Sequence, residues 1–213
     1  MEFVRLLELV GDEPVFETAL LLAGDVDPAL IYLQLSRWTS TGRVYQLRRG
    51  VYTLAPPFQK VKPHPYLVAN RMVRASYVSC QSALAYHGLI PEYVPVTVSV
   101  TTARPASWDT PLGVYRFRHI KPDLFQGYQR SEVADRQYAF IAEPEKALLD
   151  LMYLTPGSDS PAYLRELRLK NMDTLDVDEF HRQTELFDSP KLKRAANTVL
   201  DLAVLQDQSY EIL

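Results

Sequence analysis

Arginine side chains are the groups in this sequence whose type and spacing best suit a chemical task, the binding of phosphate. From Pro28 to Pro91 the chain has eight Lys or Arg residues and no Asp or Glu. Guanidinium groups form paired hydrogen bonds to phosphate oxygens. This segment is therefore a candidate polyanion site, with chance clustering of solvated charges as the alternative. Its cations are Arg37, Arg43, Arg48, Arg49, Lys60, Lys62, Arg71 and Arg74.

Residues that enzymes use for catalysis form no comparable group. The four histidines occur neither as H-E-x-x-H nor beside a C-x-x-C pair, and the glycines form no phosphate loop. No lysine has an acid two residues before it, the spacing common in restriction-type nucleases. We therefore predict no enzyme activity, no catalytic residue, no metal and no cofactor. The single cysteine, Cys80, is expected to be buried and structural.

The basic segment lies within an acidic chain. The 213 residues carry a net charge of -3, with one base against seven acids in residues 1–27 and fourteen bases against nineteen acids from residue 92 onward. No apolar run approaches the roughly 18 residues of a membrane span, and the first residues do not resemble a signal segment. With a single cysteine, which suits a reducing compartment, these features predict a cytoplasmic protein that has no membrane partner.

Three helices and a hairpin are expected to position the arginines. Apolar spacing predicts helices over 3–10 and 17–23, and a third from Pro28 to Gly42 with Asp25 or Asp27 as its cap. Alternating residues around Arg49-Gly50 then predict a β-hairpin over 44–54. This order is typical of a winged helix-turn-helix, in which the third helix enters the major groove of DNA.

The third helix has a predicted inner and outer side. Ile31, Leu35 and Trp38 share one stripe and are expected to be buried. The other side and the hairpin then supply the contacts to double-stranded operator DNA. The candidates for base edges or nearby phosphates are Tyr32, Gln34, Ser36, Arg37 and Ser40. Those for phosphates or the minor groove are Arg43, Arg48 and Arg49 on the wing and Lys60, with Lys62, beyond it.

A proline-rich segment separates this region from the rest. Pro56, Pro57, Pro63 and Pro65 predict a DNA-binding domain over 1–58, a linker over 59–65 and a C-terminal domain over 66–213. The C-terminal domain mixes strands and helices without a βαβ rhythm, so the fold class is α+β, with a larger mixed α/β second domain. Its expected strands cover 77–79, 94–102, 115–120 and 138–142, and its expected helices cover 66–74, 82–87, 143–154 and two segments of 176–205.

Several strings of the chain resemble the AbiEi family, the antitoxins of abortive-infection type IV toxin-antitoxin systems. The resemblance covers nearly the whole chain and is weakest in the last forty residues. The strings are LRRGVYTL (47–54), SYVSCQSALAYHGLIPEYVP (76–95), SVTTARP (99–105), TPLGVYRFRHIKPDLFQGY (110–128) and IAEPEKALLDLMYL (141–154).

The resemblance implies a winged-helix repressor of its own operon, active in phage defence. It also implies a C-terminal domain that counteracts a nucleotidyltransferase-like toxin, directly or indirectly. The chain departs from the family at Cys80 and Trp38, where aliphatic residues are usual. The residues matching the second-domain motifs, with roles open between fold integrity and antitoxin activity, are Tyr86, His87, Gly88, Thr101, Arg104, His119, Glu143, Pro144, Lys146 and Asp150.

Two other functions remain open at this point. The first is a stand-alone winged-helix regulator whose C-terminal domain senses a small ligand. The second is an enzyme acting on nucleic acid or nucleotides, for which the sequence offers no site.

Overall fold

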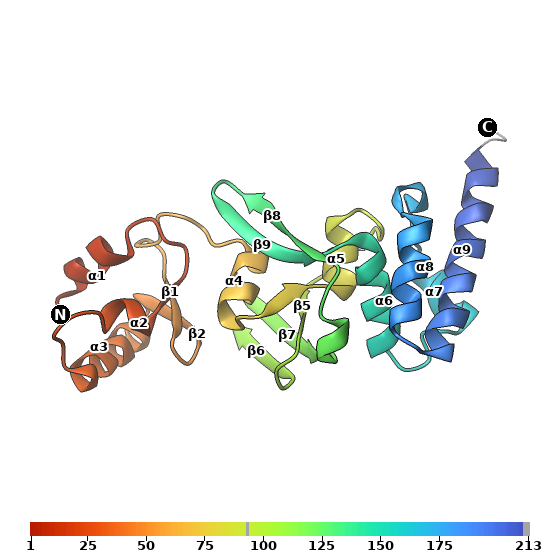
Figure 1. Ribbon diagram of the computed structural model, residues 1–213. Helices are drawn as coiled ribbons and strands as arrows, with labels where there is room; N and C mark the ends of the chain where they lie inside the picture. The colour runs from red at the N-terminus through yellow and green to blue at the C-terminus, as the bar shows by residue number, and fades with distance from the viewer. Residues whose placement is uncertain (93, 211–213) are drawn as a thin grey trace.

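The computed structural model describes residues 1–92 and 94–210 and has a mixed α+β fold (Figure 1). We call residues 1–58 the N-terminal unit and the described residues from 64 to 210 the sheet unit. The N-terminal unit contains, in chain order, α1 (Phe3–Val10), β1 (Phe16–Glu17), α2 (Thr18–Leu21), α3 (Pro28–Ser40), β2 (Val44–Arg48) and β3 (Val51–Leu54).

Local signals account for most of the N-terminal unit. Asp27 caps α3 by accepting a hydrogen bond from the Ala29 amide at 2.8 Å, and Pro28 occupies the first turn, where no amide donor is needed. The predicted inner stripe of α3 is buried. Two elements differ from the prediction. The second helix is only α2, and the two-residue strand β1 pairs with β3 in a sheet of order β1-β3-β2.

The sheet unit has six strands in the order β6-β7-β5-β4-β9-β8. Its helices gather beyond one end of the sheet, away from the N-terminal unit, except α4, which lies close to β9 (Figure 1). The elements are α4 (Pro65–Met72), β4 (Ser76–Val78), α5 (Cys80–Tyr86), β5 (Val96–Thr101), β6 (Ala106–Thr110), β7 (Gly113–His119), η1 (Pro122–Leu124), β8 (Tyr128–Ala134), β9 (Gln137–Ala142), α6 (Pro144–Leu154), α7 (Pro161–Glu166), η2 (Met172–Thr174), α8 (Val177–Leu186) and α9 (Pro190–Tyr210).

The two strands of this sheet that the sequence did not predict, β6 and β8, are its edges. Each pairs on one side only. β6 alternates in burial but has only Ala106 and Trp108 as apolar residues, and β8 shows no regular alternation of buried and exposed residues. Of the inner strands, β7 and β9 alternate between buried and exposed residues and β5 is mostly buried, and all three overlap the predicted ranges. The short helix α7 was also not predicted.

The hairpin β2–β3 lies between two hydrophobic clusters. Val44 and Tyr52 belong to the smaller cluster, which fills the N-terminal unit. Leu47 and Val51 belong to the larger cluster, which extends through the sheet unit. The segment between the units, residues 59–63, is also bonded to the sheet unit, because the side chain of Gln137 on β9 donates a hydrogen bond to the Lys62 carbonyl. The units are thus joined by packing as well as by chain. No helix of the described residues is long and apolar enough to cross a membrane.

Candidate nucleic-acid interface

The outer side of α3 presents most of the polar residues that the sequence assigned to it. Tyr32, Ser36, Arg37 and Ser40 are exposed. Gln34 is the exception. It is half-buried, and its Oε1 atom is buried without a hydrogen-bond partner among the described residues. Gln34 therefore turns its acceptor toward the protein and is poorly placed to read a base.

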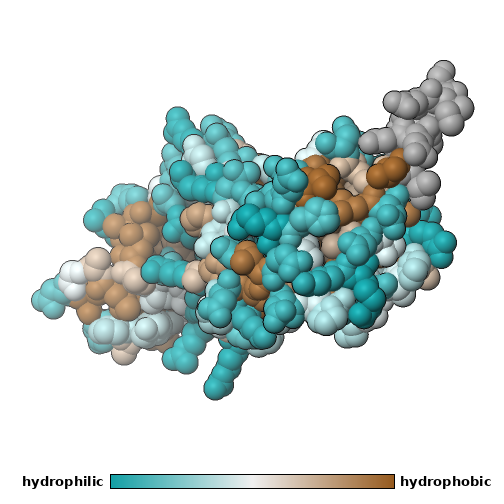
Figure 2. Space-filling model, turned by 45° about the vertical axis from the view of Figure 1, so that its right-hand side comes forward, coloured by the Kyte–Doolittle hydropathy of each residue, from teal (hydrophilic) through white to brown (hydrophobic). Residues whose placement is uncertain are grey.

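Hydrophobic side chains also lie on the outer side of α3, which the sequence analysis did not foresee. Leu30 is 56% exposed and Leu33 is 47% exposed, and Val26 precedes them in the loop before the helix. Figure 2 shows hydrophobic side chains at the surface of the N-terminal unit. Apolar side chains on a helix that enters the major groove can contact the methyl group of thymine. The same residues also suit contact with another protein.

The three arginines assigned to the hairpin do not form one group. Arg48 and Arg49 stand at the closed end, where Arg48 is half-buried, donates to the Arg49 carbonyl at 3.3 Å and leaves its Nε buried without a partner. Arg43 lies at the open end of the hairpin, directly before β2, and its guanidinium is 5.0 Å from the ring centroid of Phe3 on α1. The exposed cations of the hairpin are therefore Arg43 and Arg49, one at each end.

Acidic residues of the first 27 positions neutralise part of the basic segment in space. Lys60 pairs with Asp12 at 3.4 Å, and Arg71 approaches Glu13 at 3.8 Å. Arg74 donates to both oxygens of Glu17, and this hydrogen bonding raises the pKa of the guanidinium. Within the described residues, the segment's cations without an ion pair are Arg37, Arg43, Arg48, Arg49 and Lys62.

Lys60 is thus a weaker phosphate candidate than the sequence suggested. It remains exposed, and a surface ion pair contributes only about 0–1 kcal/mol, so a phosphate can still displace Asp12. The acids of residues 1–27 and the cations of residues 60–74 are far apart in the chain, so their pairing could not be inferred from composition.

Two of the second-domain motif residues, Lys146 and Asp150, form a buried ion pair on α6. The Tyr77 hydroxyl donates to Asp150 Oδ2 at 2.9 Å, and the Ser79 hydroxyl donates to the same oxygen at 2.8 Å. Burial raises the pKa of Asp150, and the Lys146 ammonium together with these donors lowers it. The cluster is closed to solvent, so these side chains meet no substrate or partner in this conformation.

Three further motif residues meet at the ends of β5 and β7. Thr101 and His119 are neighbours across the two strands, and the Thr101 hydroxyl donates to the Ala75 carbonyl at 3.0 Å. His119 Nδ1 lies 3.1 Å from the Ala103 carbonyl, and Arg104 follows on the exposed loop. His119 also borders a shallow hollow of about 510 Å³. Arg104 and His119 are therefore accessible, whereas Thr101 holds the loop in place.

Two more motif residues, His87 and Glu143, lie near the start of α6. His87 ends α5, and its Nε2 lies 2.8 Å from the Ala142 carbonyl. Glu143 occupies the cap position of α6 but makes no side-chain cap hydrogen bond. Glu145 on α6 instead accepts from the Asp176 amide at 2.8 Å. Glu145 therefore serves local structure, linking α6 to the start of α8.

The described residues contain no group of three or more His, Cys, Asp or Glu side chains able to hold a metal ion. A scan against protein-family models finds no match to the chain, and a search of curated proteins finds no matching relative.

Proposed function

We propose that this chain is a DNA-binding autorepressor and antitoxin of the AbiEi type, in which residues 1–58 act as a winged helix-turn-helix. The observation that carries the DNA-binding part is the set of exposed cations without ion pairs on α3 and the hairpin, Arg37, Arg43 and Arg49. Arg37 lies on α3 with the exposed Tyr32 and Ser36, which are free to approach bases, and Arg43 and Arg49 lie at the two ends of the hairpin.

The element order supports the same proposal. Helices α1, α2 and α3 are followed directly by β2 and β3, the order of a winged helix. In this arrangement α3 would enter the major groove. Arg49 would contact phosphates from the hairpin turn, and Arg43 would contact phosphates beside the end of α3.

The antitoxin part rests on the family resemblance and on accessibility. Arg104 and His119 are exposed together at one corner of the sheet, so they are among the motif residues placed to meet a toxin or its substrate. The proposed counterpart is a nucleotidyltransferase-like toxin. Lys146 and Asp150 are assigned to fold integrity because they are buried.

Fluorescence anisotropy tests the DNA-binding part. The protein is titrated against DNA from upstream of its gene and against scrambled DNA, over a series of salt concentrations. We expect tight binding to the upstream DNA that falls steeply with salt. Arg37→Ala combined with Arg49→Ala should lower the log-log salt slope by about 2, since each lost phosphate contact removes roughly 0.9.

Arg165→Ala is the matched control, because Arg165 is an exposed cation on α7, at the far end of the molecule. It should leave the slope unchanged. Binding to upstream DNA no tighter than to scrambled DNA would exclude specific repression. A slope that is equal in the wild type and the double variant would remove α3 and the hairpin turn from the interface.

A regulator that senses a small ligand is the second candidate function. A hollow of about 1140 Å³, large enough for a metabolite and lined by both units, favours it. The two functions are compatible in one chain, since the exposed cations of α3 and the hairpin do not line this hollow.

A further inference from the structure

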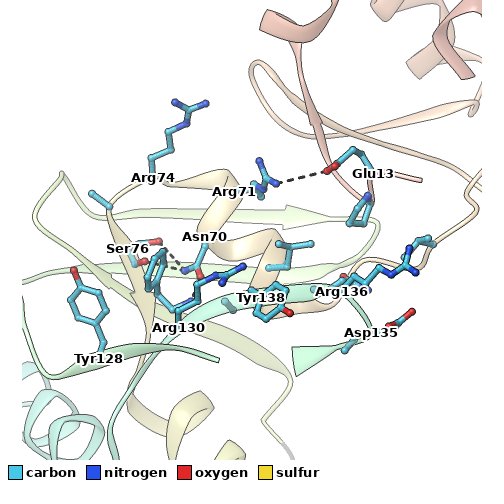
Figure 3. Close-up of a pocket in the computed structure, with 18 of the residues that line it drawn as sticks. Glu13, Asn70, Arg71, Arg74, Ser76, Tyr128, Arg130, Asp135, Arg136 and Tyr138 are labelled. Carbon is cyan, nitrogen blue, oxygen red and sulfur yellow. Dashed lines mark hydrogen bonds and ion pairs between the residues drawn. The ribbon is translucent and has the colours of Figure 1, made fainter. Parts of the chain in front are cut away.

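A hollow in the described part of the chain lies between the N-terminal unit and the β8–β9 hairpin (Figure 3). Its volume is about 1140 Å³, at the upper end of ligand sites in proteins. Asp12, Glu13 and Pro14 line it from the N-terminal unit, α4 forms one wall, and β8 and β9 form another.

The hollow exists because the sheet opens between β4 and β9. These strands pair only at Val78 and Ile141, so the rest of β9 diverges from β4. Asn70 on α4 takes the place of the missing strand partner. Its Oδ1 accepts from the Phe140 amide at 2.6 Å, and its Nδ2 donates to the Ser76 carbonyl at 3.0 Å. These bonds satisfy the Phe140 amide and the Ser76 carbonyl, and they keep β9 apart from β4 at this point.

Aromatic side chains share one face of the β8–β9 hairpin. Phe140 is 43% exposed and Tyr138 is 38% exposed, although both are large and apolar. Tyr128 on β8 lies on the same face, and its ring centroid is 5.9 Å from that of Phe140. Exposed aromatic faces in a hollow are platforms on which a flat ring can stack.

Arginines surround these rings. The Arg130 guanidinium lies 3.8 Å from the ring centroid of Tyr138, and the two are drawn side by side in Figure 3. Arg136 lines the hollow from the β8–β9 turn. Neither Arg130 nor Arg136 has an ion pair within the described residues, whereas Arg71, also in the wall, is only loosely engaged by Glu13 at 3.8 Å. Free guanidinium groups of this kind bind phosphate oxygens.

From this combination we infer that the hollow binds a nucleoside phosphate. The base stacks on Phe140, and the phosphates contact Arg130 and Arg136. The carboxylates of Asp12, Glu13 and Asp135 at the rim oppose a continuous nucleic-acid strand, which carries a phosphate at every step. They suit the hydroxyl and amino groups of a single nucleotide, which donate hydrogen bonds to carboxylates.

The inference stands apart from DNA binding by α3, because none of the exposed cations of α3 or the β2–β3 hairpin lines the hollow. Because residues of both units do, an occupant contacts both and can change how firmly they are held together.

Isothermal titration calorimetry of the full chain with ATP, GTP, CTP and UTP tests the inference. We expect at least one nucleotide to bind. The corresponding nucleoside alone and inorganic triphosphate alone should each bind more weakly than that nucleotide, by about tenfold or by a larger factor. Arg130→Ala combined with Arg136→Ala should weaken nucleotide binding by about tenfold or more. Phe140→Ala should weaken binding of the nucleotide and leave binding of inorganic triphosphate unchanged.

All three substituted side chains are exposed, so the variants should fold, which thermal unfolding checks. Arg165→Ala, which removes a distant exposed arginine, should bind like the wild type. The inference is overturned if no nucleotide binds at about 1 mM or if the arginine variant binds as the wild type does. It is also overturned if a short single-stranded oligonucleotide binds while none of the four nucleotides does, because the surface would then recognise a strand.

Discussion

Lys146 and Asp150 lie one turn apart on α6, and their side chains are 1% and 0% exposed. The sequence left the pair open between fold integrity and antitoxin activity. Burial favours fold integrity, because charges closed to solvent must satisfy each other. The Tyr77 and Ser79 hydroxyls donate hydrogen bonds to the Asp150 carboxylate. The Lys146 ammonium also lies 4.9 Å from the ring centroid of Phe187. The cluster thereby joins β4, α6 and the chain after α8.

Removing one partner of this pair should be strongly destabilising. In Lys146→Met the Asp150 carboxylate remains buried without its counter-ion, so we expect the free energy of unfolding to fall by about 3–5 kcal/mol in urea denaturation. Lys193→Met is the matched control, because Lys193 forms an exposed pair with Glu185 at 2.7 Å. It should change stability by about 1 kcal/mol or less. Similar losses for the two variants would contradict the structural role of the buried pair.

Cys80 begins α5 and is fully buried, as the sequence predicted. Burial, reinforced by the charge of Asp150, raises the pKa of its thiol to about 12. Because the thiolate is the reactive form, the folded protein should not react with Ellman's reagent at about pH 8, while the urea-unfolded chain should react fully. Rapid labelling of the folded protein would show that α5 opens readily.

At the scale of elements, the position of α3 depends on its cap. The sequence left Asp25 and Asp27 as alternatives, and the structure selects Asp27 through its bond to the Ala29 amide. Asp27→Ala should lower the free energy of unfolding by about 1 kcal/mol. Asp25→Ala removes the same charge without a cap bond and should change it by about 0.5 kcal/mol or less. Equal effects of the two changes in urea denaturation would indicate a charge effect in place of capping.

At the scale of the whole molecule, the β2–β3 hairpin couples the two units. Leu47 is 2% exposed and belongs to the cluster of the sheet unit, although its strand pairs within the N-terminal unit. We therefore expect the chain to unfold in one transition. Leu47→Ala should lower the free energy of unfolding by about 2–5 kcal/mol and separate the calorimetric transition into two.

Leu33→Ala is the control for this prediction, because Leu33 is exposed on α3. It should change stability by about 0.5 kcal/mol or less and keep a single transition. Two transitions in the wild type would mean that the units fold independently and that the hairpin contact contributes little.

The sequence by itself determined the features that depend on neighbouring residues. Spacing of apolar residues predicted the inner stripe of α3, the turn at Arg49-Gly50 predicted the β2–β3 hairpin, and strands mixed with helices without a βαβ rhythm predicted the α+β class. These predictions succeeded because periodicity, capping and turn geometry act within a few residues. The edge strands β6 and β8 were missed because β6 has only two apolar residues, Ala106 and Trp108, and β8 shows no regular alternation.

Only the tertiary structure decided which charges are free and which side chains are accessible. The Arg74–Glu17 pair joins residues 57 positions apart, and the burial of Lys146 depends on side chains from β4 and the chain after α8. The hollow beside Phe140 arises because β9 diverges from β4. Each of these features results from contacts between segments that are distant in the chain. Composition and spacing, which describe only neighbours, therefore could not have determined them.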